Sequence, residues 1–243
     1  MQNDESEPSV YALGPDDAFP FTCGPENVCF NACCRSLSQA LSPYDALRLS
    51  RRLGISTGEF LASRVLIVIG PETGLPVVTL APGPGDDQPC PFVTAEGCGV
   101  YQDRPGSCRT YPLARAAGRD KTTGQVREKY YLVREAHCQG HGAGRRWTAR
   151  EWVESQGLSV YNEMNDLFLP VLGAKKKTGN ARLSQEKARL FLMSCYDPDA
   201  FYGVLARGKA PAGGKLPDRP PATDEDALRF GLAWAAEVLF TLP

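Results

Sequence analysis

The sequence lacks both a long apolar run and an excess of charge of one sign. Of its 243 residues, 27 are Lys or Arg and 28 are Asp or Glu, which gives a formal net charge of -1. Such a balance provides no overall field that would attract nucleic acid or an anionic membrane. No apolar stretch approaches the roughly 20 residues that span a bilayer. We therefore expect no nucleic acid and no membrane as partner.

The N-terminus lacks the positively charged segment and following apolar stretch that are typical of a secretory signal. It reads MQNDESEPSVYALGPDD, which is acidic and polar. This pattern favours a cytoplasmic location, where thiols stay reduced and disulfides are rare. Residues 1–20 also show no periodicity, so the sequence predicts a flexible N-terminal arm over this range, without a chemical role.

Cysteine, by contrast, is abundant, although a chain with 42% hydrophobic residues can build a core without cross-links. Eight of the nine cysteines fall into two groups between residues 23 and 138. Clustered thiolates suit iron-sulfur clusters and zinc, because soft sulfur ligands bind these metals well. The predicted metal ligands are Cys23, Cys29, Cys33 and Cys34 in the first group, and Cys90, Cys98, Cys108 and Cys138 in the second.

The adjacent pair Cys33 and Cys34 bears on the kind of metal. In zinc ribbons the paired ligands are separated by two to four residues, so that both sulfurs can point inward. A cluster with several iron atoms accommodates an adjacent pair more easily, so we expect an iron-sulfur cluster, of the 4Fe-4S type, with zinc as the alternative. Packed free thiols and disulfides are less favoured interpretations of the eight cysteines. Cys195 lies in a separate apolar segment, which predicts a packed thiol and not a ligand.

Five further residues lie beside the cysteines. His137 and His141 flank Cys138, and either imidazole could replace a thiolate, although a supporting role beside the ligands is more usual. The cations Arg35, Arg104 and Arg109 could offset the negative charge of a thiolate-bound centre, or they could form ordinary surface salt bridges. The sequence leaves these alternatives open.

Helix caps and strand patterns predict an α+β fold. Ser42, Ser56, Thr148, Ser184 and Thr223 each stand where a helix N-cap is expected. The runs at residues 66–69 and 75–80 are rich in β-branched side chains and predict a small antiparallel hairpin. Residues 129–133 are a third candidate strand. The predicted organisation is a cysteine-rich metal-binding domain at 21–145, a helical extension at 146–202, a Pro/Gly-rich linker at 203–221 and a C-terminal helix at 222–243.

The ordered motifs around the cysteines resemble the YkgJ-like cysteine-cluster family. They include Cys33-Cys34-Arg35, Cys90-Pro91-Phe92, Cys98-Gly99-Val100-Tyr101, Cys108-Arg109-Thr110-Tyr111-Pro112 and Cys138-Gln139-Gly140. The resemblance covers about residues 20–145 and implies chelation of zinc or iron by the cysteines. It also implies a distant relation to flagellin lysine methylases. The spacing after Cys23 is longer than in the common short form of the motif.

Three functions agree with these features. The leading prediction is an iron-sulfur protein in electron transfer or a cluster-dependent reaction, with an unidentified redox or protein partner. The alternatives are a zinc-stabilised protein-binding module and a lysine N-methylase-like enzyme. No catalytic acid, base or nucleophile stands out, so the sequence does not decide whether the protein is an enzyme. Residues 35–89 can fold back on themselves, which predicts one interleaved core in which Cys90 lies beside Cys34.

Overall fold

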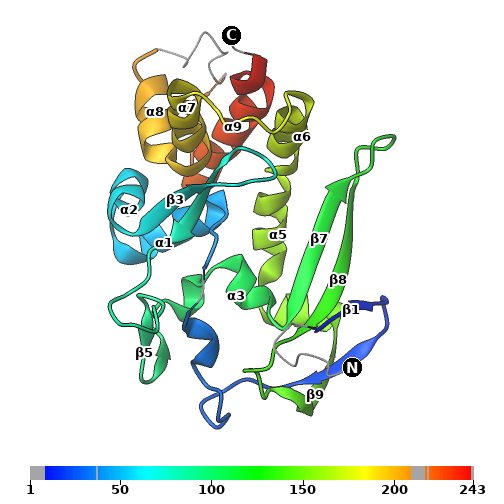
Figure 1. The fold of residues 1–243 in the computed structure, drawn as a ribbon. Coiled ribbons are helices and arrows are strands. Elements are labelled where there is room, and N and C mark those ends of the chain that lie inside the picture. The colour runs from blue at the N-terminus through cyan, green and yellow to red at the C-terminus, as the bar shows by residue number, and fades with distance from the viewer. Residues whose placement is uncertain (1–8, 37, 209–216, 218, 242–243) are drawn as a thin grey trace. The chain divides into compact units, whose positions relative to one another are not determined.

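The structure is a computed structural model that describes residues 9–36, 38–208, 217 and 219–241. It combines helices with small antiparallel sheets, which confirms the predicted α+β class (Figure 1). The chain divides into two compact units, and each unit is built from two separate segments of the sequence. The first unit comprises residues 1–37 and 82–162, and the second comprises residues 38–81 and 163–243.

Two sheets form the framework of the first unit. Strands β1 (Ser9–Leu13), β8 (Val126–Arg134) and β7 (Leu113–Arg119) make an antiparallel sheet in the order β1-β8-β7. Strand β2 (Ala18–Phe21) pairs with β9 (His141–Thr148). The predicted strand at residues 129–133 is therefore confirmed within the longer β8. A core of buried side chains packs between these elements and contains Phe19, Phe21, Leu113, Leu132, Ala149 and Trp152.

Strands β1 and β2 correct the prediction of a flexible arm over residues 1–20. From Ser9 onward the chain is paired, with β1 along β8 and β2 along β9, whereas residues 1–8 lie outside the described residues. The sequence does not reveal β1 because four of its five residues are exposed and leave no apolar alternation. Main-chain hydrogen bonds to β8 hold this edge strand in place.

The remaining elements of the first unit are short. They are the 3-10 helices η1 (Ala32–Cys34) and η2 (Tyr101–Asp103), strands β5 (Val93–Thr94) and β6 (Gly97–Cys98), and helices α3 (Gly106–Thr110) and α4 (Ala149–Ser155), followed by α5 (Leu158–Asp166) at the boundary of the two units. Thr148 and Glu151 form the predicted capping box of α4, since each side chain accepts the backbone N–H of the other residue.

The second unit is mainly helical. Its helices are α1 (Pro43–Leu53), α2 (Thr57–Ser63), α6 (Leu169–Lys177), α7 (Gln185–Tyr196), α8 (Pro198–Leu205) and α9 (Asp224–Glu237), and the 3-10 helix η4 (Leu239–Thr241) follows α9. Strands β3 (Val65–Ile69) and β4 (Pro76–Leu80) form the predicted hairpin. The caps predicted at Ser42, Ser56, Ser184 and Thr223 are all confirmed, because each side chain accepts the backbone N–H three residues later.

The predicted linker over residues 203–221 begins too early. Helix α8 continues to Leu205, because Phe201 and Leu205 are buried and extend the apolar face of the helix. Residues 209–216 and 218 lie outside the described residues. In the described parts of the chain, no helix is both long and apolar enough to cross a membrane.

An ion network joins three helices of the second unit. The Arg51 guanidinium of α1 donates two hydrogen bonds to Asp199 of α8, at 2.6 and 3.0 Å, and two to Asp224 of α9, also at 2.6 and 3.0 Å. Backbone and hydroxyl groups of Thr57 donate to Asp199 as well. The hydrogen bond from Arg51 is the main reason that the pKa of Asp199 falls to about 2. These bidentate contacts fix how α1, α8 and α9 meet.

Helices α7 and α9 approach each other closely at Gly231. A Cβ atom at this position would lie 2.0 Å from the carbonyl oxygen of Ser194. Both residues are buried, so neither backbone can move away without disturbing the packing around it. A residue without a side chain is therefore required at this helix crossing.

We predict that Gly231→Ala destabilises the protein by about 1–3 kcal/mol, because the added methyl group overpacks the crossing. The free energy of unfolding in urea measures this change. Gly173→Ala in α6 is the matched control, since no atom beyond its own helix lies within 4 Å of the added Cβ. The control should be neutral or stabilising by up to about 1 kcal/mol. Equal effects of the two substitutions would contradict the close approach.

Candidate metal centre

All eight predicted ligands belong to the first unit, and none of them is in a disulfide. In the first group, Cys23 follows β2, Cys29 lies in a turn, and Cys33 and Cys34 end the helix η1. Asn31 precedes this helix in the left-handed conformation, with a φ of 67°, which turns the chain sharply between Cys29 and the pair. The local fold thus gathers four thiols within twelve positions.

The second group is held by more regular structure than its sequence predicts. The sequence places these cysteines on loops, which is correct for Cys90 and Cys138. Cys98 instead ends strand β6, and Cys108 lies within helix α3. Short elements of this kind escape sequence patterns, because a strand of two residues and a helix of five are too short to show a period.

Backbone hydrogen bonds bring the two groups together. The N–H of Cys90 donates to the carbonyl of Cys34 at 2.7 Å, and the N–H of Ser36 donates to the carbonyl of Asp87 at 2.8 Å. From the other end of the second group, the N–H of Gln139 donates to the Sγ of Cys29 at 3.2 Å. The structure therefore places Cys90 beside Cys34, as the sequence predicts.

The thiols also influence one another electrostatically. Cys23 has an exposed surface, but surrounding protein atoms partly desolvate its thiol and raise its pKa. The nearby Cys33, Cys138 and Cys29 raise the pKa further. Cys34 interacts in the same way with Cys90 and Cys108, and Cys90 interacts with Cys98. These neighbour relations link all eight cysteines into one group, which we call the thiol cluster.

The two thiols of the adjacent pair shift each other's pKa strongly. The Cys34 thiol donates a hydrogen bond to the Cys33 sulfur, which lowers the pKa of Cys33 to about 7. The same bond raises the pKa of Cys34, because its proton is held between the two sulfurs. Thiolates, and not thiols, bind metals. The pair can therefore lose a first proton more readily than an isolated thiol, which favours metal binding at this position.

The chemistry of the donor set fits a thiolate-bound zinc ion or iron-sulfur cluster, since one compact unit contains eight sulfurs outside any disulfide. Within the residues that the structure describes, no three His, Cys, Asp or Glu side chains converge closely enough to hold a metal ion. Binding would thus require the cysteine side chains to close around the metal. Such coupling is common, because ligand loops are completed by the metal that they bind.

Arg104 and Arg109 supply positive charge beside the thiol cluster. The Arg104 guanidinium donates to the carbonyl of Tyr101 and the side chain of Gln156, both at 2.6 Å. Burial lowers the pKa of Arg104, whereas Cys108 and Cys98 act to raise it. The charge of Arg104 in turn opposes part of the rise in the pKa of Cys23. Arg104 is thus held by a carbonyl and an amide, and its electrostatic effect on the thiols agrees with charge compensation.

The Arg109 side chain is buried and anchors the segment that carries Cys108. Its guanidinium donates to the carbonyls of Arg104, Gln102 and Gln156, and it stacks on the Tyr161 ring at 4.6 Å from the ring centroid. Three carbonyls in different directions match the planar donor fork of arginine. Arg109 therefore fixes the backbone between Gln102 and Cys108.

Arg35 forms a surface salt bridge, which is one of the two roles that the sequence left open. It forms an ion pair with Asp87, and both side chains are about half exposed. Exposed pairs of this kind contribute little to stability. The pair nevertheless joins the chain just after Cys34 to the chain just before Cys90.

Tyr111 is a residue of the site to which the sequence assigns no role. Its hydroxyl oxygen is buried and has no hydrogen bond of good geometry among the described residues. Burial raises its pKa, and so do the neighbouring side chains of Cys138 and Glu135. The phenol can thus donate to the Cys138 sulfur after a small movement. Its position three residues after Cys108 is the only signal that the sequence contains.

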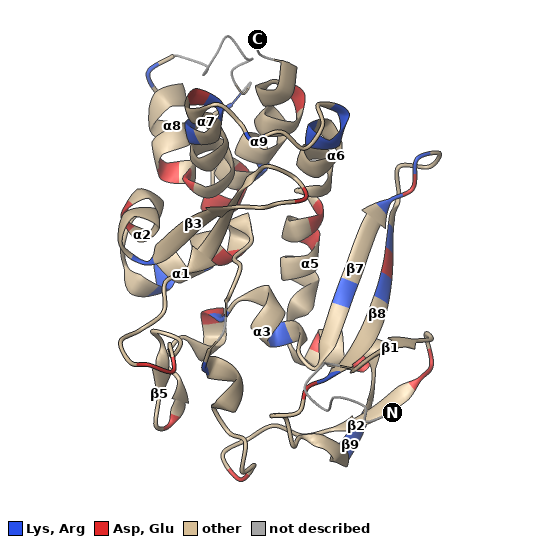
Figure 2. Cartoon of the chain, in the orientation of Figure 1, with Lys and Arg blue, Asp and Glu red and all other residues tan. Residues whose placement is uncertain are grey.

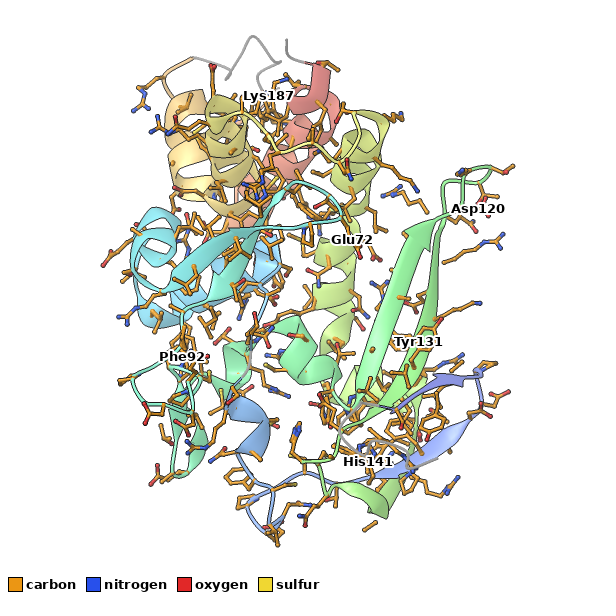
Figure 3. The ribbon with its side chains drawn as sticks, in the orientation of Figure 1. Glu72, Phe92, Asp120, Tyr131, His141 and Lys187 are labelled. Atoms are coloured by element: carbon orange, nitrogen blue, oxygen red, sulfur yellow. The ribbon has the colours of Figure 1, made fainter. Side chains whose placement is uncertain are left out.

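The two histidines differ in environment. His141 begins β9 (Figure 3). Its ring packs against Phe21 with 5.2 Å between ring centroids. Both ring nitrogens are buried without a hydrogen-bond partner among the described residues, and burial lowers the pKa of His141. His137 lies 3.8 Å from Glu135 and is partly exposed. The imidazole of His141 is therefore neutral at pH 7, the form that can bind a metal.

Cys195 lies outside the thiol cluster, in the second unit. Its side chain is fully buried in α7, and burial raises its pKa to about 12. These properties are those of the packed thiol that the apolar segment predicts.

Comparison with protein families identifies the region that carries the thiol cluster. Residues 22–139 match the family model CxxCxxCC, described as "Putative zinc- or iron-chelating domain". These residues form a CxxCxxCC domain. The match confirms the YkgJ-like resemblance of the cysteine motifs, and it includes all eight cysteines of the thiol cluster but not Cys195. No curated protein and no solved structure gives a significant match to the chain.

We predict that Arg109→Lys destabilises the CxxCxxCC domain by about 1–3 kcal/mol, because an ammonium group cannot reach all three carbonyls at once. Thermal or denaturant unfolding of the full-length protein measures the loss. Arg35→Lys is the matched control and should cost less than about 1 kcal/mol, since its partner Asp87 is exposed. A cost for Arg109→Lys no larger than that of the control would show that Arg109 is not an anchor.

Proposed function

We propose that the CxxCxxCC domain binds an iron-sulfur cluster and that the protein serves in electron transfer or a cluster-dependent reaction. The observation that carries the proposal is the thiol cluster itself, in which eight cysteines outside any disulfide share one compact unit and hydrogen bonds join the two groups. A single structural zinc ion takes only four ligands. Eight sulfurs with an adjacent pair suit a larger centre, or one cluster with a second site.

The residues of the domain would assist such a centre in different ways. When bound, an iron-sulfur cluster supplies one-electron chemistry. Arg104 offsets part of the negative charge of the thiolates, and positive charge near a cluster raises its reduction potential. Tyr111 can donate a hydrogen bond to the Cys138 sulfur, and such a bond would also raise the reduction potential of the centre.

A zinc-stabilised protein-binding module is the second candidate. The observation in its favour is the exposure of large apolar side chains close to the thiol cluster. Val28, beside Cys29, is 89% exposed, and Tyr101 is 55% exposed. Exposed apolar side chains are typical of sites that contact other proteins. A redox partner would use the same surface, so metal identity is what separates the two candidates. A lysine N-methylase-like activity remains a third alternative.

We predict that anaerobically purified protein is brown, contains iron and sulfide, and absorbs broadly near about 400 nm, because thiolate-bound iron-sulfur centres have charge-transfer bands there. Metal analysis and a visible spectrum test this prediction. Cys108→Ser should lose metal and stability together, whereas Cys195→Ala, the matched control, should keep the full metal content. Colourless protein with stoichiometric zinc would contradict the iron-sulfur proposal and support the zinc module.

A further inference from the structure

Strand β3 of the second unit exposes a continuous apolar surface that the proposed function does not use. Its sequence is VLIVI, and Leu66, Ile67, Val68 and Ile69 are 53%, 45%, 52% and 37% exposed. No charged residue interrupts the strand (Figure 2). Both faces of the strand are accessible, because neighbouring side chains point in opposite directions.

The outer edge of β3 is also unpaired. In the described part of the chain, β3 has β4 as its one strand neighbour. The carbonyl of Arg64 accepts from Ala81, and the N–H of Gly70 donates to Leu75. Because hydrogen-bonded positions alternate in an antiparallel pair, the backbone N–H and C=O groups of Leu66 and Val68 also point toward β4. The N–H and C=O groups of Val65, Ile67 and Ile69 therefore point away from β4.

We propose that the β3 edge pairs with β3 of a second copy of this chain. Antiparallel pairing about a two-fold axis at Ile67 places Ile67 opposite itself and Val65 opposite Ile69 of the second copy. All three outward-facing residues then occupy hydrogen-bonded positions, which gives up to about six main-chain hydrogen bonds. The register is thus self-complementary, as a two-fold interface requires.

Charge at the ends of β3 supports the same register. Arg64 precedes the strand and Glu72 lies in the turn that follows it, and both are exposed (Figure 3). Among the described residues, neither side chain has a recorded ion pair. In the antiparallel dimer, Arg64 lies opposite Gly70 of the second copy, close to Glu72 of the second copy. A strand edge without charges could pair in several registers. The charges at the two ends of β3 favour the register in which Arg64 lies near Glu72 of the second copy.

The interface formed by a five-residue strand is small compared with stable dimer interfaces, which bury about 800 Å² on each partner. We therefore expect a reversible dimer whose population depends on protein concentration. A continuous four-stranded sheet, β4-β3-β3-β4, would cross the interface. The β3 edge belongs to the second unit and the thiol cluster to the first, so this interface contains none of the proposed metal ligands.

Sedimentation velocity of the full-length, metal-loaded protein over a range of concentrations tests the proposal. The wild type should shift from monomer to dimer as concentration rises, and Ile67→Lys should weaken dimerisation at least about tenfold, because two lysines would face each other at the axis. Val10→Lys is the matched control on the exposed edge strand β1 and should dimerise like the wild type. A wild type that stays monomeric, or equal effects of the two substitutions, would overturn the proposal.

A charge-reversal cycle and hydrogen exchange provide a second test that does not depend on Ile67→Lys folding. Arg64→Glu and Glu72→Arg should each weaken the dimer, and the double variant should recover part of the loss. In wild-type protein, the amides of Val65, Ile67 and Ile69 should become more protected from exchange as concentration rises. Dimers in which these amides exchange equally at all concentrations would show that another surface is used.

Discussion

The mutual repulsion of neighbouring thiolates is the constraint on which the chemistry of the thiol cluster depends. Eight sulfurs in one compact region cannot all ionise at low cost, since each thiolate raises the pKa of its neighbours. Two features reduce this cost. A hydrogen bond between Cys33 and Cys34 stabilises one thiolate of the pair, and the positive charge of Arg104 lies close to the thiols. A bound cation would relieve the remaining repulsion, which explains why such a cluster is suited to a metal.

The route of the chain brings the two cysteine groups together. The segment between the two cysteine groups, residues 38–81, belongs to the second unit, so the chain leaves the thiol cluster after Cys34 and returns before Cys90. Contacts of Ser36 and Arg35 with Asp87, and the hydrogen bond from Cys90 to Cys34, join the two ends of this excursion. The two cysteine groups can therefore form one site although 55 residues separate Cys34 from Cys90.

Sequence reasoning succeeded where a local signal determines structure. Helix starts were predictable because a capping side chain acts within three residues, as at Ser42 and Thr148. The hairpin at β3 and β4 was predictable from β-branched runs on either side of a turn. The thiol cluster was predictable because cysteine is rare enough to be informative.

Features that depend on distant partners were not predictable. Strand β1 exists because β8 offers it hydrogen bonds, and its own exposed residues contain no pattern. The roles of Tyr111 and Arg109 arise from contacts with Cys138 and with the carbonyl of Gln156, which lie 27 and 47 positions further along the chain. Spacing along a sequence does not encode such neighbours.

If cysteines of both groups share one metal centre, anomalous X-ray diffraction from crystals of the metal-loaded protein should show it. Data at the iron and zinc absorption edges would identify the metal and locate each atom, and metal–sulfur distances near about 2.3 Å would identify the ligands. We predict a centre bound by at least one cysteine from residues 23–34 and at least one from residues 90–138. Centres that are each bound by cysteines of a single group would contradict it.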